Sequence, residues 1–198
     1  MGIRLYSALA DTNLSAFIWS VADLLRGDYK QSDYGKVILP FTVLRRLDCV
    51  LEPTKAAVLE EKALREGQGL DPEPFLLRKA GHNFCNTSPL DMKRLMGDGD
   101  NIAENLRSYI QAFTPAVRDI FDSFEFHLQV DRLEKANLLY LITEKFGQID
   151  LHPQAVSNAQ MGLVFEELIR KFAELSNETA GEHFTPREVI RLMVNLIF

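Results

Sequence analysis

The residues best suited to binding chemistry lie at positions 180–189, where the sequence reads AGEHFTPREV. Thr185 is placed to cap a helix that Pro186 opens, which leaves the N–H groups of the first turn free for a carboxylate or a phosphate. Gly181 lets the preceding loop approach closely, and Phe184 beside Glu182 could hold an organic cation or an adenosine. On these residues alone, an ordinary loop and helix cap is the better-supported interpretation.

Other chemistry-bearing residues form weaker patterns. The four histidines are scattered, with no pair at the i,i+4 spacing of metal ligands, so we predict no metal site. No order or spacing supports a Ser/His/Asp or Cys/His arrangement. Cys49 and Cys85 belong to no CxxC motif and are predicted to be reduced thiols, Cys49 as a small buried hydrophobe on a helix.

Two adjacent arginines, Arg45 and Arg46, follow Lys30 and Lys36 in the sequence. Such a basic group could contact DNA phosphates in an assembly. A solvated helix face, or an ion pair with Asp48, is the favoured interpretation.

The elements that must position these residues are nearly all predicted to be helices. Apolar residues recur at helical spacing, with Ser, Thr or Asp caps before them and Gly after them. The predicted helices span 14–25, 37–51, 54–65, 74–79, 89–97, 100–113, a segment from 115, 128–146, 157–175 and 185–197. Pro40 lies within the second, so that helix should kink or begin there. A short strand is predicted around Phe84, and the fold class is mainly α.

The chain of 198 residues divides best at 147–157, between an N-terminal helical domain (1–150) and a second unit (151–198). The last helix is still apolar at Phe198 and has no cap, which predicts a protein that continues beyond it; a short protein that docks its last helix is the alternative. Composition excludes a disordered tail or a fibre, with 46% hydrophobic and 25% charged residues. The net charge of −6 argues against coating nucleic acid by charge alone.

No segment approaches the roughly 18 apolar residues of a membrane span, and the N-terminus lacks a secretory apolar core. We therefore predict a cytoplasmic protein without a membrane partner.

Three strings resemble one family, in that family's order. They are ILPFTVLRRLDCVLE at 38–52, GLVFEELIRKF at 162–172 and AGEHFTPREVIRLM at 180–193. The first is similar to the N-terminal helical domain of the modification (M) subunits of type I restriction–modification systems, which are N6-adenine DNA methyltransferases. The third resembles their motif X, and the second resembles the helix before it.

The resemblance implies a helical domain followed by the first helices of a Rossmann-like methyltransferase domain. It implies a full-length parent that transfers a methyl group from S-adenosylmethionine to N6 of adenine in double-stranded DNA. One wall of the cofactor pocket would be formed by Glu182, His183, Phe184, Thr185, Pro186 and Arg187. The family's glycine-containing cofactor loop and its Asn-Pro-Pro-Phe or Asp-Pro-Pro-Tyr catalytic motif do not occur in this sequence. The resemblance therefore implies no catalytic residue in this chain, and the chain alone should be inactive.

The resemblance also implies three protein partners, which are a specificity subunit, a second M subunit and a restriction subunit. The helical domain would then serve assembly with these subunits and with DNA. Two alternatives are a free-standing helical interaction module without enzymatic activity and a helix-turn-helix DNA binder. The acidic net charge and the lack of a basic recognition helix count against the second.

Overall fold

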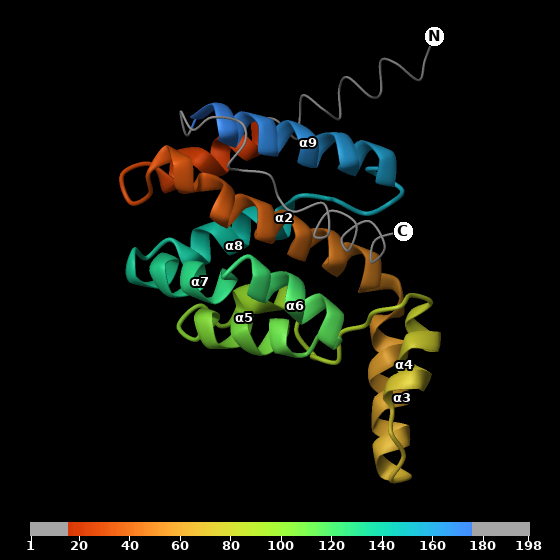
Figure 1. Ribbon diagram of the computed structural model, residues 1–198. Coiled ribbons are helices and arrows are strands. Elements are labelled where there is room, and N and C mark those ends of the chain that lie inside the picture. Colours follow the sequence, from red (N-terminus) through yellow and green to blue (C-terminus); the bar gives the residue numbers. More distant parts are fainter. Residues whose placement is uncertain (1–15, 176–198) are drawn as a thin grey trace.

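The computed structural model describes residues 16–175, and helices make up most of this range (Figure 1). The first helix occupies residues 16–25. It is followed by α2 (Tyr34–Leu51), α3 (Lys55–Gly67), α4 (Glu73–Ala80), α5 (Ile102–Gln111), α6 (Pro115–Ser123), α7 (Phe126–Lys135), α8 (Leu139–Gln148) and α9 (Asn158–Leu175). Short 3-10 turns lie at Gln31–Asp33, Glu52–Thr54 and Arg94–Gly97. Strand pairing in the described part is limited to two isolated bridges, so the mainly α prediction is confirmed there.

The central element is α2, and it is buried on almost every side. All its residues except Lys36 and Leu39 are buried, including the charged Arg45, Arg46 and Asp48. Figure 1 shows α9 along one side of α2 and the α7–α8 pair along the other, with α5 and α6 beyond that pair. This arrangement makes α2 the scaffold that the remaining helices share.

Pro40 does not begin a helix, because α2 runs from Tyr34 to Leu51 and includes it. Proline lacks the N–H that would bond to the carbonyl four residues earlier. That carbonyl belongs to Lys36, one of the two residues of α2 that are not buried. The alternative that the helix begins at Pro40 is wrong, and the kink stays a prediction.

Helices α3 and α4 form a hairpin that extends away from the other helices (Figure 1). The guanidinium of Arg65 lies 4.0 Å from the centre of the Phe75 ring, and Glu61 accepts a 2.7 Å hydrogen bond from Arg65 Nε. Gly69, with φ of +70°, makes the reversal that follows α3. The helix predicted at 74–79 is confirmed as α4, and the one predicted at 54–65 as α3.

Residues 84–97 are less regular than predicted. The short strand predicted around Phe84 is wrong. The β pairing nearest to Phe84 is a single isolated bridge between Asn86 and Phe113. The helix predicted at 89–97 is reduced to the turn Arg94–Gly97. The side chain of Asn86 links this segment to α5. It donates a hydrogen bond to Tyr109 O at 2.9 Å and accepts one from Ser88 N at 2.9 Å. Ser88 consequently caps a local turn instead of a helix.

The long helix predicted at 128–146 is two helices, α7 and α8. Asn137 adopts a left-handed φ of +57° and ends α7. Its N–H bonds to Glu134 O at 3.0 Å, and the N–H of Leu138 bonds to Leu133 O at 2.9 Å. These two bonds are those of a Schellman C-cap, which usually contains glycine at the position of Asn137.

Several predicted boundaries are confirmed. The first helix stops before Gly27, whose φ is +102°. Thr114 precedes α6 and Pro115 is its first residue. Ser157 precedes α9 and caps it with a reciprocal capping box, in which its N–H bonds to Gln160 Oε1 at 2.9 Å and its Oγ accepts from Gln160 N at 3.3 Å.

None of the helices in residues 16–175 has the length and apolar character needed to cross a bilayer.

Candidate functional site

The six residues predicted to line the cofactor pocket lie outside the described residues. They are Glu182, His183, Phe184, Thr185, Pro186 and Arg187. Their assignment therefore stays a prediction. The described residues instead contain a buried polar cluster on α2, which touches the segment between α8 and α9, and an open pocket beside it.

The first part of this cluster is centred on Asp48. Arg45 Nη1 donates to Asp48 Oδ2 at 2.6 Å, and the two side chains are only 5% and 7% exposed. The hydroxyl of Tyr109 donates to Asp48 Oδ1 at 2.7 Å, and the N–H of Met92 donates to the same oxygen at 3.3 Å. Burial, together with the charge of Asp48, raises the pKa of Tyr109 well above its ordinary value, so the hydroxyl stays a donor.

The second part is the side chain of Arg46, which is completely buried. Its Nη1 donates to the carbonyl oxygens of Leu151 and Val156, the latter at 2.8 Å, and its Nη2 donates to Asn158 Oδ1. Arg45 reaches the same segment, because its Nε donates to Ile149 O at 2.8 Å. Burial lowers the pKa of Arg46.

These contacts decide between the interpretations of the two arginines. The ion pair of Arg45 with Asp48 is confirmed, and the solvated helix face is wrong because both arginines are buried. In this fold both guanidiniums are almost fully buried and bonded to protein acceptors, so neither is available to a DNA phosphate. The hydrogen-bond partners of Arg46 lie more than 100 residues away in sequence, and no local pattern could have indicated them.

Both cysteines are free and buried, and Cys49 lies on a helix as predicted. Cys49 is buried with Leu151 and Met161 in a small apolar cluster next to Arg46, and burial raises the pKa of its thiol. Burial also raises the pKa of Cys85 to about 11. A thiol that stays protonated is a poor nucleophile and a poor metal ligand. Among the described residues, no three His, Cys, Asp or Glu side chains are grouped so that they could hold a metal ion.

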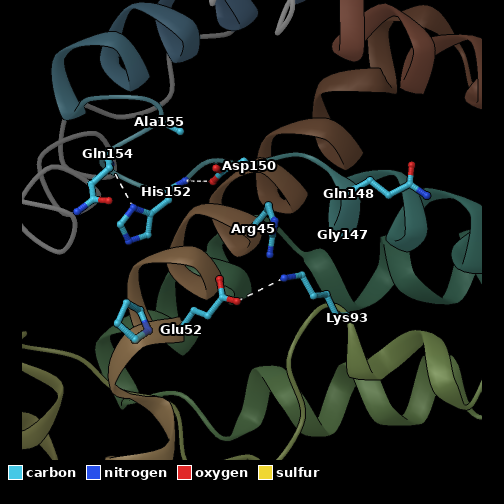
Figure 2. Close-up of a pocket in the computed structure, with 10 residues that line it drawn as sticks. Arg45, Glu52, Lys93, Gly147, Gln148, Asp150, His152, Gln154 and Ala155 are labelled. Atoms are coloured by element: carbon cyan, nitrogen blue, oxygen red, sulfur yellow. Dashed lines mark hydrogen bonds and ion pairs between the residues drawn. The ribbon is translucent and has the colours of Figure 1, made fainter.

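An open pocket lies between α2 and the segment that follows α8, and Figure 2 shows the residues around it. Its lining comes from separate parts of the sequence: Arg45, Glu52, Pro53, Lys93, Gly147, Gln148, Asp150, His152, Gln154 and Ala155. Glu52 and Lys93 face each other with 3.4 Å between carboxylate and ammonium, and His152 Nδ1 accepts from Gln154 N at 3.2 Å. Basic and acidic side chains balance here, with Arg45 and Lys93 against Glu52 and Asp150.

Comparison with known proteins defines the family. Residues 14–146, more than half of the chain, match the HsdM N-terminal domain family, and the chain therefore belongs to that family. Residues 156–197 match the N-6 DNA methylase family. The resemblance to type I modification subunits found in the sequence is thus confirmed.

One curated relative is the type I restriction enzyme MjaIX methylase subunit of Methanocaldococcus jannaschii. It is 23% identical to this chain in an alignment that covers 91% of this chain and 34% of the relative. The chain therefore spans about a third of the length of that relative. No solved structure matches the chain.

Proposed function

We propose that this chain is part of the modification subunit of a type I restriction–modification system. The full-length parent would transfer a methyl group from S-adenosylmethionine to N6 of adenine in double-stranded DNA. The observation that carries the proposal is the order of the two family matches, with the helical domain at 14–146 followed directly by the N-6 DNA methylase segment at 156–197. We accordingly divide the chain into a helical domain at 1–150 and the beginning of a methyltransferase domain at 151–198.

The cofactor would contact residues 182–187. If a helix begins at Thr185-Pro186, as the sequence predicts, its first turn would offer free N–H groups and the positive end of its dipole to the carboxylate of the cofactor's methionine moiety. Thr185 would add a hydrogen bond, and Phe184 would supply an apolar surface. S-adenosylmethionine supplies the activated methyl group; these residues of the chain bind and orient it.

The target adenine must leave the base stack before its N6 can be reached. No Asn-Pro-Pro-Phe or Asp-Pro-Pro-Tyr motif occurs in this sequence, so we propose that other parts of the parent supply the catalytic residues. The helical domain would serve assembly with a specificity subunit, a second modification subunit, a restriction subunit and DNA in the cytoplasm.

Calorimetric titration of S-adenosylmethionine into the full-length parent separates this proposal from a free-standing interaction module. The proposal expects saturable binding, and the module expects none. Thr185→Val keeps the side-chain shape but removes the hydroxyl, which should weaken binding by on the order of 1–2 kcal/mol, or about 5- to 30-fold. Phe184→Ala should also weaken binding, because it removes apolar contact with the cofactor.

Melting curves of the two variants provide the control. A helix cap with no role in binding would lower thermal stability and leave the affinity of the folded molecules unchanged. Unchanged affinity in both variants would therefore remove residues 182–187 from the site. Absence of cofactor binding by the wild-type parent would contradict the proposed function itself.

A further inference from the structure

We infer that residues 149–158 form a rigid connection between α8 and α9, which hydrogen bonds from Arg45 and Arg46 hold against α2. We call this segment, together with the two arginines, the α2 joint. It includes most of the stretch between the two family matches, which end at 146 and begin at 156, and the first residues of the second match. A connection between domains is commonly exposed and mobile. Residues 153–155 of this one are exposed too, but its main chain accepts hydrogen bonds from two buried side chains of α2.

The first support is the set of hydrogen bonds from the arginines. They reach four different residues of the segment, through the carbonyl oxygens of Ile149, Leu151 and Val156 and the side chain of Asn158. Three of the acceptors are main-chain atoms, so the bonds fix the path of the chain itself. Hydrogen bonds from a charged donor are about twice as strong as those between neutral groups.

The second support is the burial of Arg46. Its hydrogen-bond acceptors in the joint are neutral oxygens, and the negative charge of Asp150, also in the joint, acts on it as well. Together these groups of the joint replace part of the solvation that the guanidinium loses on leaving water. If the segment moved away, the buried guanidinium would lose its acceptors, which would cost free energy. The bonds made by Arg46 thus depend on residues 151–158 staying in place.

The third support is the apolar packing of the joint and of the helix that follows it. Leu151 and Met161 are only 1% and 2% exposed and pack with Cys49 of α2. Farther along α9, a Cβ placed on Gly35 of α2 would lie 3.2 Å from the ring of Phe172. Because Gly35 has no side chain, α9 can lie close to α2 here as well, and α9 is anchored at two separated points.

The consequence is that α9 should follow any movement of the helical domain as part of one rigid body. If the segment from 156 onward begins a methyltransferase domain, as proposed above, the joint sets the orientation of that domain relative to the assembly domain. Only this consequence rests on the proposed function. The existence of the joint does not depend on it.

Hydrogen–deuterium exchange of the whole 198-residue chain, measured by mass spectrometry without cofactor or DNA, tests the joint directly. In the wild type, amides in 151–158 should exchange about 100-fold or more slowly than those in the α3–α4 reversal at 67–72. Arg46→Met fills a similar volume without the donors and should speed exchange across 149–161 at least tenfold, while α5 to α8 keep their protection. Arg26→Met, at an exposed arginine, is the matched control and should change nothing in 149–161.

Wild-type exchange in 151–158 that is as fast as in 67–72 would overturn the inference without any variant. Equal acceleration throughout the Arg46→Met protein would also overturn it, because Arg46 would then be an ordinary core residue. If Arg46→Met does not fold, Asn158→Ala removes one acceptor and should accelerate 149–161 selectively by a smaller factor. No acceleration in that variant would count against the joint.

Discussion

At the residue scale, Asp48 is the acceptor on which the polar interior depends. It receives hydrogen bonds from Arg45, from the hydroxyl of Tyr109 and from the main chain of Met92. Asp48→Ala would leave the guanidinium of Arg45 buried without its carboxylate. Breaking a buried ion pair from one side typically costs about 3–5 kcal/mol, and we expect a loss of this size in the free energy of unfolding measured with urea.

Two further variants calibrate this measurement. Asp48→Asn keeps the volume and one acceptor oxygen, so it should cost less than Asp48→Ala. Asp122→Asn changes an exposed carboxylate on α6 and should stay within about 0.5 kcal/mol of the wild type. If Asp48→Ala cost no more than Asp122→Asn, the ion pair would have no structural importance.

Only some contacts of the Asp48 cluster could be predicted from the sequence. The i,i+3 spacing of Arg45 and Asp48 makes their ion pair predictable, because both lie on one face of a helix. Tyr109 comes from a helix 61 positions away, and its contribution depends on how α5 packs against α2. Local patterns do not contain that information, so the burial of the pair could not be predicted.

At the element scale, the break between α7 and α8 depends on Asn137. Its left-handed φ of +57° is strained for a β-branched residue and free of cost for glycine. Asn137→Val should therefore lower the free energy of unfolding by about 1–2 kcal/mol. Asn137→Gly should be neutral or slightly stabilising. Thermal denaturation followed by circular dichroism measures both.

Glu104→Val provides the comparison, because Glu104 is exposed on α5 in ordinary helical conformation. Its cost should be limited to helix propensity, a few tenths of a kcal/mol. Equal melting temperatures for Asn137→Gly and Asn137→Val would mean that residue 137 does not determine the break.

Helix boundaries were predictable where a side chain or glycine marked them. Ser157 with Gln160, Thr114-Pro115 and Gly27 all correspond to observed ends. The break at Asn137 was missed because its cap is made by main-chain bonds without glycine. Ser88-Pro89 was misinterpreted because the long-range tie from Asn86 to Tyr109 outweighs local capping preference.

At the scale of the whole molecule, charge and burial together predict weak DNA binding by this chain alone. The net charge is −6, and the adjacent arginines of α2 are buried. Fluorescence anisotropy with duplexes of different sequence, at about 150 mM salt, should give dissociation constants no tighter than about 1 μM and no sequence preference. Nanomolar or sequence-selective binding would contradict this expectation.

The most direct test of the methyltransferase proposal is the chemical identity of the product on DNA. Duplex DNA of mixed sequence is incubated with S-adenosylmethionine and the full-length parent together with its specificity subunit, digested to nucleosides and analysed by mass spectrometry. We predict N6-methyldeoxyadenosine from this reaction and none from the same reaction with the 198-residue chain alone. Unmodified DNA, a methyl group on cytosine, or N6-methyldeoxyadenosine formed by the chain alone would contradict the proposal.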